Sequence, residues 1–126
     1  MGKAVLVIDD ENSVGRLLRF NLRQKGYTVE IAETAAEGLA KAQAGAFDLV
    51  ILDVALPGTD GIEACQLLKN LEQYRETPVI MISSRSDSVT IEKARRAGAA
   101  DYLVKPFTFE ELQRRIQDQL ARPFIV

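Results

Sequence analysis

The sequence contains no histidine and no tryptophan, and it has a single cysteine. Without histidine there can be no Ser-His-Asp triad, no histidine-ligated metal and no imidazole acid or base. Cys65 has no second cysteine with which to form an internal disulfide, and its place in an apolar helical pattern predicts a small buried side chain. Any chemistry therefore has to come from carboxylates, hydroxyls, lysine or a hard metal ion.

An excess of one charge and long apolar runs are also missing. The chain has 16 basic and 18 acidic residues, a formal charge of -2 with no basic footprint, so we expect no direct nucleic-acid partner. No run approaches the roughly 18 apolar residues of a membrane span. A strand begins at residue 3, which leaves no room for a signal peptide. We therefore expect a cytoplasmic, single-domain protein with no membrane partner.

Strand and helix patterns alternate along the whole chain. Strands are predicted at 3–8, 27–32, 49–53, 78–84 and 101–105, and residues 49–52 form a fully apolar run typical of a strand buried on both faces. A helical pattern follows each strand. Capping boxes at Thr34 with Glu37 and at Thr108 with Glu111 predict two of the helix starts. In the first helix Asn12 or Ser13 is the expected N-cap, and the residues at helical spacing are Val14, Leu17, Leu18 and Leu22.

Five successive strand-helix units predict an α/β fold. We expect a (βα)5 doubly wound, five-stranded parallel sheet with the flavodoxin-like order 2-1-3-4-5. This order places the first, third, fourth and fifth strands side by side. Their ends carry Asp9 and Asp10, Asp53, Ser83, and Lys105. Because ligands of such sheets bind beyond the carboxyl ends of the strands, these residues form the candidate site.

Three neighbouring carboxylates repel one another, by about 4 kcal/mol for each pair 4 Å apart at an effective dielectric constant of 20. Lys105 offsets part of this charge, and a hard divalent cation, preferably Mg²⁺, offsets the rest. Such a site suits phosphoryl transfer, in which charge on the phosphoryl oxygens is neutralised. Asp53 is the better candidate for a nucleophile that forms an aspartyl phosphate, because it stands alone on a central strand.

These motifs together resemble the receiver domain of two-component response regulators, with a match from residue 5 to about residue 120. The matching segments are Asp9-Asp10, Asp53 with Leu56-Pro57-Gly58, Met81-Ile82-Ser83 and Asp101-Tyr102-Leu103-Val104-Lys105-Pro106-Phe107. The resemblance implies that residues 1–126 form one receiver domain that catalyses its own phosphorylation and dephosphorylation. Asp53 would accept the phosphoryl group from a histidine kinase or a histidine phosphotransfer protein.

The resemblance also implies a metal site. Asp10, Asp53 and the backbone carbonyl of Ala55 would bind Mg²⁺, with Mn²⁺ as a possible substitute. Asp9 would assist through a water molecule.

A switch is implied as well. Ser83 would donate to the phosphoryl group, Lys105 would pair with it, and Tyr102 would be the aromatic residue that turns inward. The face made by the fourth helix, fifth strand and fifth helix would then bind an output domain or a downstream protein. The Lys105–Pro106 peptide bond is expected to be cis.

Three positions are expected to set the lifetime of the aspartyl phosphate. Ala55 and Arg85 lie two residues beyond Asp53 and Ser83, and neither side chain orients an attacking water well. Ser84 adds a second hydroxyl beside the phosphate path. We therefore expect fairly slow self-dephosphorylation.

A weak homodimer is a further expectation from the resemblance. Asp101 and Arg115 match residues that form cross-dimer ion pairs in regulators with winged-helix output domains, but Ala100 replaces an acid common in that group. The chain ends shortly after the last predicted helix, so it is either a single-domain regulator or the receiver of a longer one.

The residues present disfavour three other functions. A receiver-like module that binds proteins independently of phosphorylation is expected to have a damaged acid or lysine position, and this chain has none. A phosphatase or transferase of the haloacid dehalogenase type carries a second acid two residues after the nucleophile, where Ala55 stands. A flavin or nucleotide module would need a phosphate-cradling loop after the first strand, but Asp9-Asp10-Glu11 would repel a phosphate that lacks a bridging metal.

Overall fold

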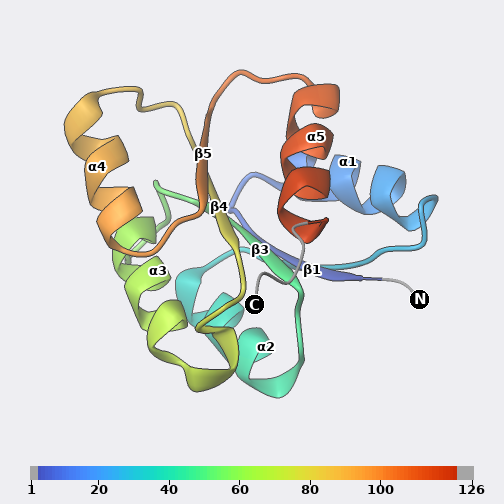
Figure 1. The fold of residues 1–126 in the computed structure, drawn as a ribbon, viewed down its shortest axis with the longest axis horizontal. Coiled ribbons are helices and arrows are strands. Elements are labelled where there is room, and N and C mark those ends of the chain that lie inside the picture. The colour runs from blue at the N-terminus through green and yellow to red at the C-terminus, as the bar shows by residue number, and fades with distance from the viewer. Residues whose placement is uncertain (1–2, 122–126) are drawn as a thin grey trace.

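The structure, a computed structural model, describes residues 3–121 of the chain. All five predicted strand-helix units are present (Figure 1). The elements in order are β1 (Ala4–Ile8), α1 (Asn12–Arg23), β2 (Thr28–Ala32), α2 (Ala35–Ala44), β3 (Leu49–Asp53), α3 (Gly61–Asn70), η1 (Glu72–Tyr74), β4 (Val79–Ser83), α4 (Ser88–Arg96), β5 (Asp101–Val104) and α5 (Phe109–Leu120). The short 3₁₀ helix η1 was not predicted.

The strands form one parallel sheet in the order β2-β1-β3-β4-β5. The prediction of a flavodoxin-like fold is therefore confirmed. All residues of β3 and β4 are buried, as their unbroken apolar character requires for strands covered on both faces. The carboxyl ends of β1, β3, β4 and β5 consequently meet at one edge.

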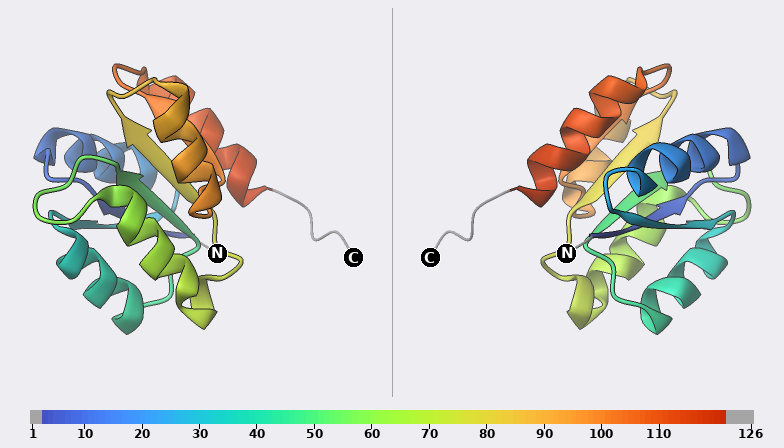
Figure 2. Two further views of the ribbon diagram at one scale, coloured as in Figure 1. Left: turned by 90° about the vertical axis from the view of Figure 1, so that its left-hand side faces the viewer. Right: turned by 90° about the vertical axis from the view of Figure 1, so that its right-hand side faces the viewer.

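The helices divide between the two faces of the sheet, as Figure 2 shows from two sides. Leu18 and Leu22 of α1 pack with Leu112 and Ile116 of α5 against one face. Helices α2, α3 and α4 cover the other face with small side chains such as Ala42, Ala64, Cys65 and Ala94. Two apolar layers, one on each face, therefore stabilise the sheet.

No helix among the described residues has the length and apolar character needed to cross a membrane.

The threonines predicted to cap two of the helices do so. The hydroxyl oxygens of Thr34 and Thr108 each accept a hydrogen bond from a backbone N–H three residues later, at 3.1 Å. The prediction for the first helix is wrong, because the N-cap residue of α1 is Glu11, whose side chain makes no capping bond. The carboxylate of Glu11 has another partner, which belongs to the candidate site.

For three side chains the observed burial can be compared with what the sequence predicts. Cys65 is fully buried, as predicted, and burial raises the pKa of its thiol to about 11, which keeps it protonated. Leu17, by contrast, is 52% exposed although it shares the helical spacing of the buried residues of α1. Tyr74, in a stretch predicted only as polar, is buried and donates its hydroxyl hydrogen to the carbonyl oxygen of Ala42.

Candidate functional site

The candidate site is built at the carboxyl edge of the sheet. Asp9 follows β1, Asp53 ends β3, Ser83 ends β4 and Lys105 follows β5. Parallel pairing of β3 with β4 sets Asp53 opposite Ile82, one residue before Ser83. Asp9, Asp53 and Ser83 are 0%, 4% and 1% exposed, so all three polar side chains lie beneath the surface. The strand order that was predicted to place these strand ends side by side is the one observed.

Three carboxylates form a compact acidic cluster. One oxygen each from Asp9, Asp10 and Asp53 lies within 4.8 Å of the others. Asp10 is exposed, whereas the other two are buried. The Oδ2 atom of Asp9 is buried without a hydrogen-bond partner among the described residues. An all-oxygen donor set with an unsatisfied buried oxygen fits a hard divalent cation such as Mg²⁺.

Burial and neighbouring charge alter the acidity of Asp9. Burial is the main cause that raises its pKa from 3.8 to about 6, and the charge of Asp53 adds to it. The backbone N–H of Glu11, which donates to Asp9 Oδ1 at 2.9 Å, acts in the opposite direction, as does the charge of Lys105. The cluster therefore holds more negative charge than its own hydrogen bonds neutralise.

Lys105 supplies the positive charge of the site. Its Nζ atom lies 2.9 Å from Asp53 Oδ2, 2.8 Å from Glu11 Oε1 and 3.6 Å from Asp9 Oδ2. Burial alone would lower the pKa of the Lys105 ammonium, but the hydrogen bonds to Asp53 and Glu11 raise that pKa above its ordinary value. Lys105 is therefore a permanent cation. The Lys105–Pro106 peptide bond is cis, as predicted.

The loop after β3 holds Asp53 through the backbone. The N–H of Ala55 donates to Asp53 Oδ1 at 2.9 Å, and the N–H of Gly61 donates to the carbonyl oxygen of Val54 at 2.8 Å. A Cβ atom on Gly61 would lie 2.1 Å from the carbonyl oxygen of Asp53. The start of α3 can therefore approach the end of β3 only because residue 61 is glycine.

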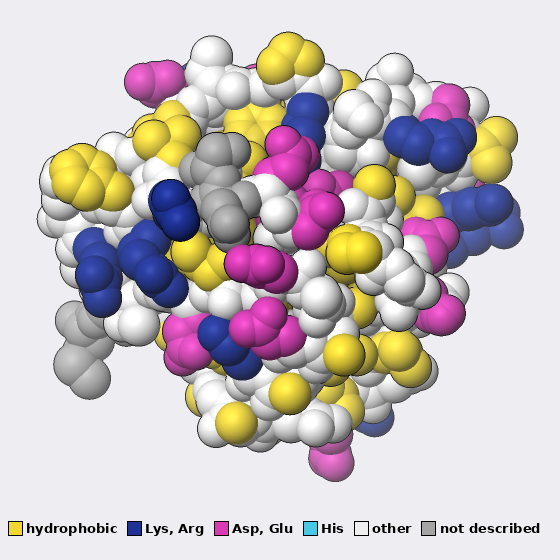
Figure 3. All heavy atoms as spheres, turned by 180° about the vertical axis from the view of Figure 1, so that it is seen from behind, with side chains coloured by type: hydrophobic (Ala, Val, Ile, Leu, Met, Phe, Trp, Pro, Cys, Tyr) yellow, Lys and Arg dark blue, Asp and Glu magenta, His cyan; other side chains and the backbone are white. Residues whose placement is uncertain are grey.

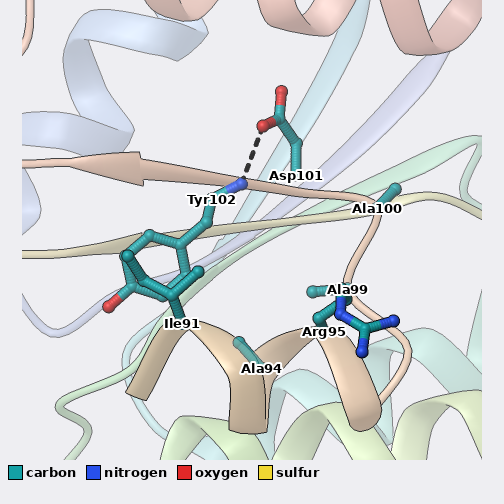
Figure 4. A pocket seen from close by; sticks show the side chains of 7 residues that line it. All are labelled: Ile91, Ala94, Arg95, Ala99, Ala100, Asp101 and Tyr102. Atoms are coloured by element: carbon teal, nitrogen blue, oxygen red, sulfur yellow. Dashed lines mark hydrogen bonds between the residues drawn. The ribbon is translucent and has the colours of Figure 1, made fainter. Parts of the chain in front are cut away.

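A chain of hydrogen bonds links the end of β4 to β5. Ser83 Oγ accepts from the N–H of Arg85 at 3.0 Å, and the carbonyl oxygen of Arg85 accepts from the hydroxyl of Tyr102 at 2.7 Å. The Arg85 side chain pairs with Asp87, with Nε 3.2 Å from Oδ1. Tyr102 also lines a hollow of about 310 Å³ between α4 and β5, together with Ile91 and other residues labelled in Figure 4.

The remaining predicted residues lie around this centre. Ser84 is exposed and lines a groove together with Lys105. Arg115 and Asp101 pair within one chain, with Nη1 2.6 Å from Oδ1. Sequence reasoning missed Glu11 as a partner of Lys105 and missed Gly61 as a support for Asp53. The only sequence signal for Glu11 is its place directly after Asp9-Asp10.

Comparisons with known proteins agree with this geometry. A model of the response regulator receiver domain matches residues 5–117. The transcriptional regulatory protein ResD of Bacillus subtilis is 37% identical over 118 residues, which are 94% of this chain and 48% of ResD. The chain spans about half the length of the curated relatives it matches.

Solved structures give the same result. The chemotaxis response regulator CheY4 of Vibrio cholerae has a TM-score of 0.90 at 34% identity, with 95% of this chain and 100% of that chain covered. The receiver domain of the sensor histidine kinase PA1611 of Pseudomonas aeruginosa, which was solved with a magnesium ion in its active-site cleft, has a TM-score of 0.86 at 28% identity. That likeness covers 97% of this chain and 100% of the other. The chain therefore belongs to the family of response regulator receiver domains.

Proposed function

We propose that this domain accepts a phosphoryl group on Asp53 from a histidine kinase or a histidine phosphotransfer protein. The observation that carries the proposal is the position of Asp53, whose carboxylate lies 2.9 Å from Lys105 Nζ and within 4.8 Å of the carboxylates of Asp9 and Asp10. A nucleophile, a permanent cation and an oxygen-rich metal site are the parts that phosphoryl transfer needs.

In the proposed step an oxygen of Asp53 forms a bond to phosphorus while the bond from phosphorus to the donor nitrogen breaks. The bonding electron pair returns to that nitrogen, and the imidazole leaves. The backbone N–H of Ala55 holds the other carboxylate oxygen, and Lys105 pairs with charge on the transferred group. Asp10, Asp53 and the Ala55 carbonyl, with Asp9 acting through water, would hold Mg²⁺ or Mn²⁺, which would supply further charge neutralisation.

The switch runs through Ser83 and Tyr102. Ser83 Oγ and the Tyr102 hydroxyl both bond to the backbone of Arg85, so movement of Ser83 toward a phosphoryl oxygen disturbs the anchor of Tyr102. The hollow beside Ile91 offers room for the ring on the side of α4. We expect the α4-β5-α5 face to respond and to bind an output domain, a downstream protein or, weakly, a second copy of the chain.

A protein donor has to approach through an opening next to Lys105. A groove of about 500 Å³ adjoins the site, and its lining residues are Val14, Leu17, Ser84, Lys105, Pro106 and Phe107. Because Lys105 belongs to both groove and site, we propose that a helix bearing the phosphohistidine docks here. A donor kinase would first be identified by testing a panel of phosphorylated histidine kinases. L17D should slow phosphoryl transfer from that kinase about tenfold and leave charging by acetyl phosphate unchanged. Equal transfer to wild type and L17D would reject this docking site.

Acetyl phosphate with Mg²⁺ provides the direct test. Intact-mass analysis should show one added phosphoryl group on the wild-type chain and none on D53N, and EDTA should abolish the gain. Wild-type protein that gains nothing, or D53N that gains equally, would refute the proposal and favour a protein-binding module independent of phosphorylation. The native gene length would show whether residues 1–126 act as a single receiver domain or with an attached output domain.

The lifetime of the phosphorylated form tests the roles of Ala55, Ser84 and Arg85. The Arg85 side chain pairs with Asp87, and Ala55 has no polar side chain, so neither orients an attacking water. We expect slow loss of phosphate that A55N or R85Q accelerates. Rapid loss that R85Q does not change would contradict this role.

A further inference from the structure

Glu11 makes a contact that its local position does not require. As the N-cap residue of α1 it could bond to free N–H groups of the first helical turn, yet it makes no capping bond. Its Oε1 atom instead lies 2.8 Å from Nζ of Lys105, a residue 94 positions away in the sequence. The side chain of Glu11 is thus held across the mouth of the site.

The contact occupies the exposed side of the Lys105 ammonium. The side chain of Glu11 is 61% exposed, whereas those of Asp9 and Asp53 are 0% and 5% exposed. Lys105 itself is 19% exposed. An ammonium has three donors, and Asp53 and Glu11 engage it at hydrogen-bond distance. An anion that arrives from solvent therefore has to compete with Glu11 for the Lys105 ammonium.

We propose that Glu11 is a positioning residue that occupies Lys105 in the unphosphorylated protein and has to release it before a phosphoryl oxygen can pair with that ammonium. This proposal rests on the phosphoacceptor function of Asp53. Glu11 is an internal competitor for the phosphoryl group. It slows charging by small anionic donors and weakens binding of phosphoryl mimics such as beryllofluoride.

General repulsion by the surrounding acids would produce a similar effect without any pairing. Acidic side chains do gather in the middle of the surface seen in Figure 3, while basic ones lie mainly toward its left and right edges. Glu33 provides a matched control, because it is an exposed glutamate directly after β2 at the same edge of the sheet. E33Q removes the same charge as E11Q and leaves the pairing of Lys105 intact.

The test compares wild type, E11Q, E11D and E33Q. The measurements are beryllofluoride affinity in Mg²⁺, followed by ¹⁹F NMR, and the rate of charging by acetyl phosphate. Loss of one charge about 6 Å from the incoming anion should tighten binding and speed charging about three- to tenfold in E11Q. E11D keeps the charge but shortens the side chain by one methylene group, so it should retain part of the gain. E33Q should match wild type.

A second readout follows the ammonium itself. The NMR signals of the Lys105 side chain in the metal-free, unphosphorylated protein should shift in E11Q and E11D but not in E33Q. E11Q that charges and binds beryllofluoride like wild type would overturn the proposal, and so would E33Q with the same gain as E11Q. If wild type itself is never charged while the Lys105 signals still respond to E11Q, the pairing stands and the phosphoacceptor function fails.

Discussion

Asp9 makes the metal-free protein less stable than its fold would otherwise allow. Its carboxylate is fully buried, and Oδ2 has no hydrogen-bond partner among the described residues. D9N keeps an oxygen for the N–H of Glu11 and replaces the unsatisfied oxygen with an amide that can donate to Asp53. We therefore expect D9N to be more stable than wild type when EDTA is present at neutral pH.

The magnitude follows from the pKa of Asp9, which burial and the charge of Asp53 raise from 3.8 to about 6. Below pH 3.8 the group is protonated in both the folded and unfolded states and costs nothing. Above pH 6 it is ionised in both, and the folded state carries the full penalty, at most about 3 kcal/mol. The contribution of Asp9 to stability therefore falls as the pH rises from about 4 to 6.

Urea unfolding followed by circular dichroism measures the effect at pH 4.5 and 7.5. D9N should exceed wild type by about 1–3 kcal/mol at pH 7.5 in EDTA and by much less at pH 4.5. Excess Mg²⁺ should narrow the gap at pH 7.5, because a ligand at 100 times its Kd adds about 2.7 kcal/mol to the state that binds it. D118N, at an exposed position of α5, should show no such pattern. An advantage of D9N that is absent, or equal at both pH values, would refute the reasoning.

Three further substitutions test the supports of the fold and site. G61A should lower the free energy of unfolding by about 2–4 kcal/mol and slow charging by acetyl phosphate, because its Cβ would lie 2.1 Å from the carbonyl oxygen of Asp53; unchanged kinetics would contradict this. Y74F keeps the buried ring but removes the donor to Ala42, and should cost about 1–2 kcal/mol in urea unfolding. T108A should cost about 1 kcal/mol by removing the cap of α5, and T108S should restore most of it.

The residues that could be predicted share one property: their backbone position follows from the sheet. Asp53 and Ser83 end buried strands, and Asp9 and Lys105 come directly after strands. Parallel pairing brings those ends together independently of the loop conformations. An apolar run followed by a polar residue was therefore sufficient to predict that the residue lies at the site. The capping threonines were predictable for a related reason, because their partners lie only three residues away.

The burial of some residues was predicted wrongly because it depends on the exact position and direction of their side chains. Leu17 repeats at helical spacing, but the packed stripe of α1 passes through Leu18 and Leu22 and leaves Leu17 at 52% exposure. Tyr74 lies in the short 3₁₀ helix η1, where the sequence shows no hydrophobic periodicity. Its hydroxyl can be buried because the carbonyl of Ala42 is close enough to accept its hydrogen bond. Neither distinction exists in a one-dimensional pattern.

Glu11 shows why the chemistry of a site is harder to predict than its location. At the start of a helix a glutamate is favoured by the helix dipole wherever its side chain points, so the sequence alone does not distinguish a cap from a longer reach. The choice is made by Lys105, whose ammonium is placed by β5 at 2.8 Å from Glu11 Oε1. Strand order predicts that acids and a lysine meet, whereas their pairing depends on side-chain lengths and on loops that no periodicity describes. A substitution that keeps the charge but changes the length of the side chain, such as E11D, therefore tests the pairing that the sequence could not predict.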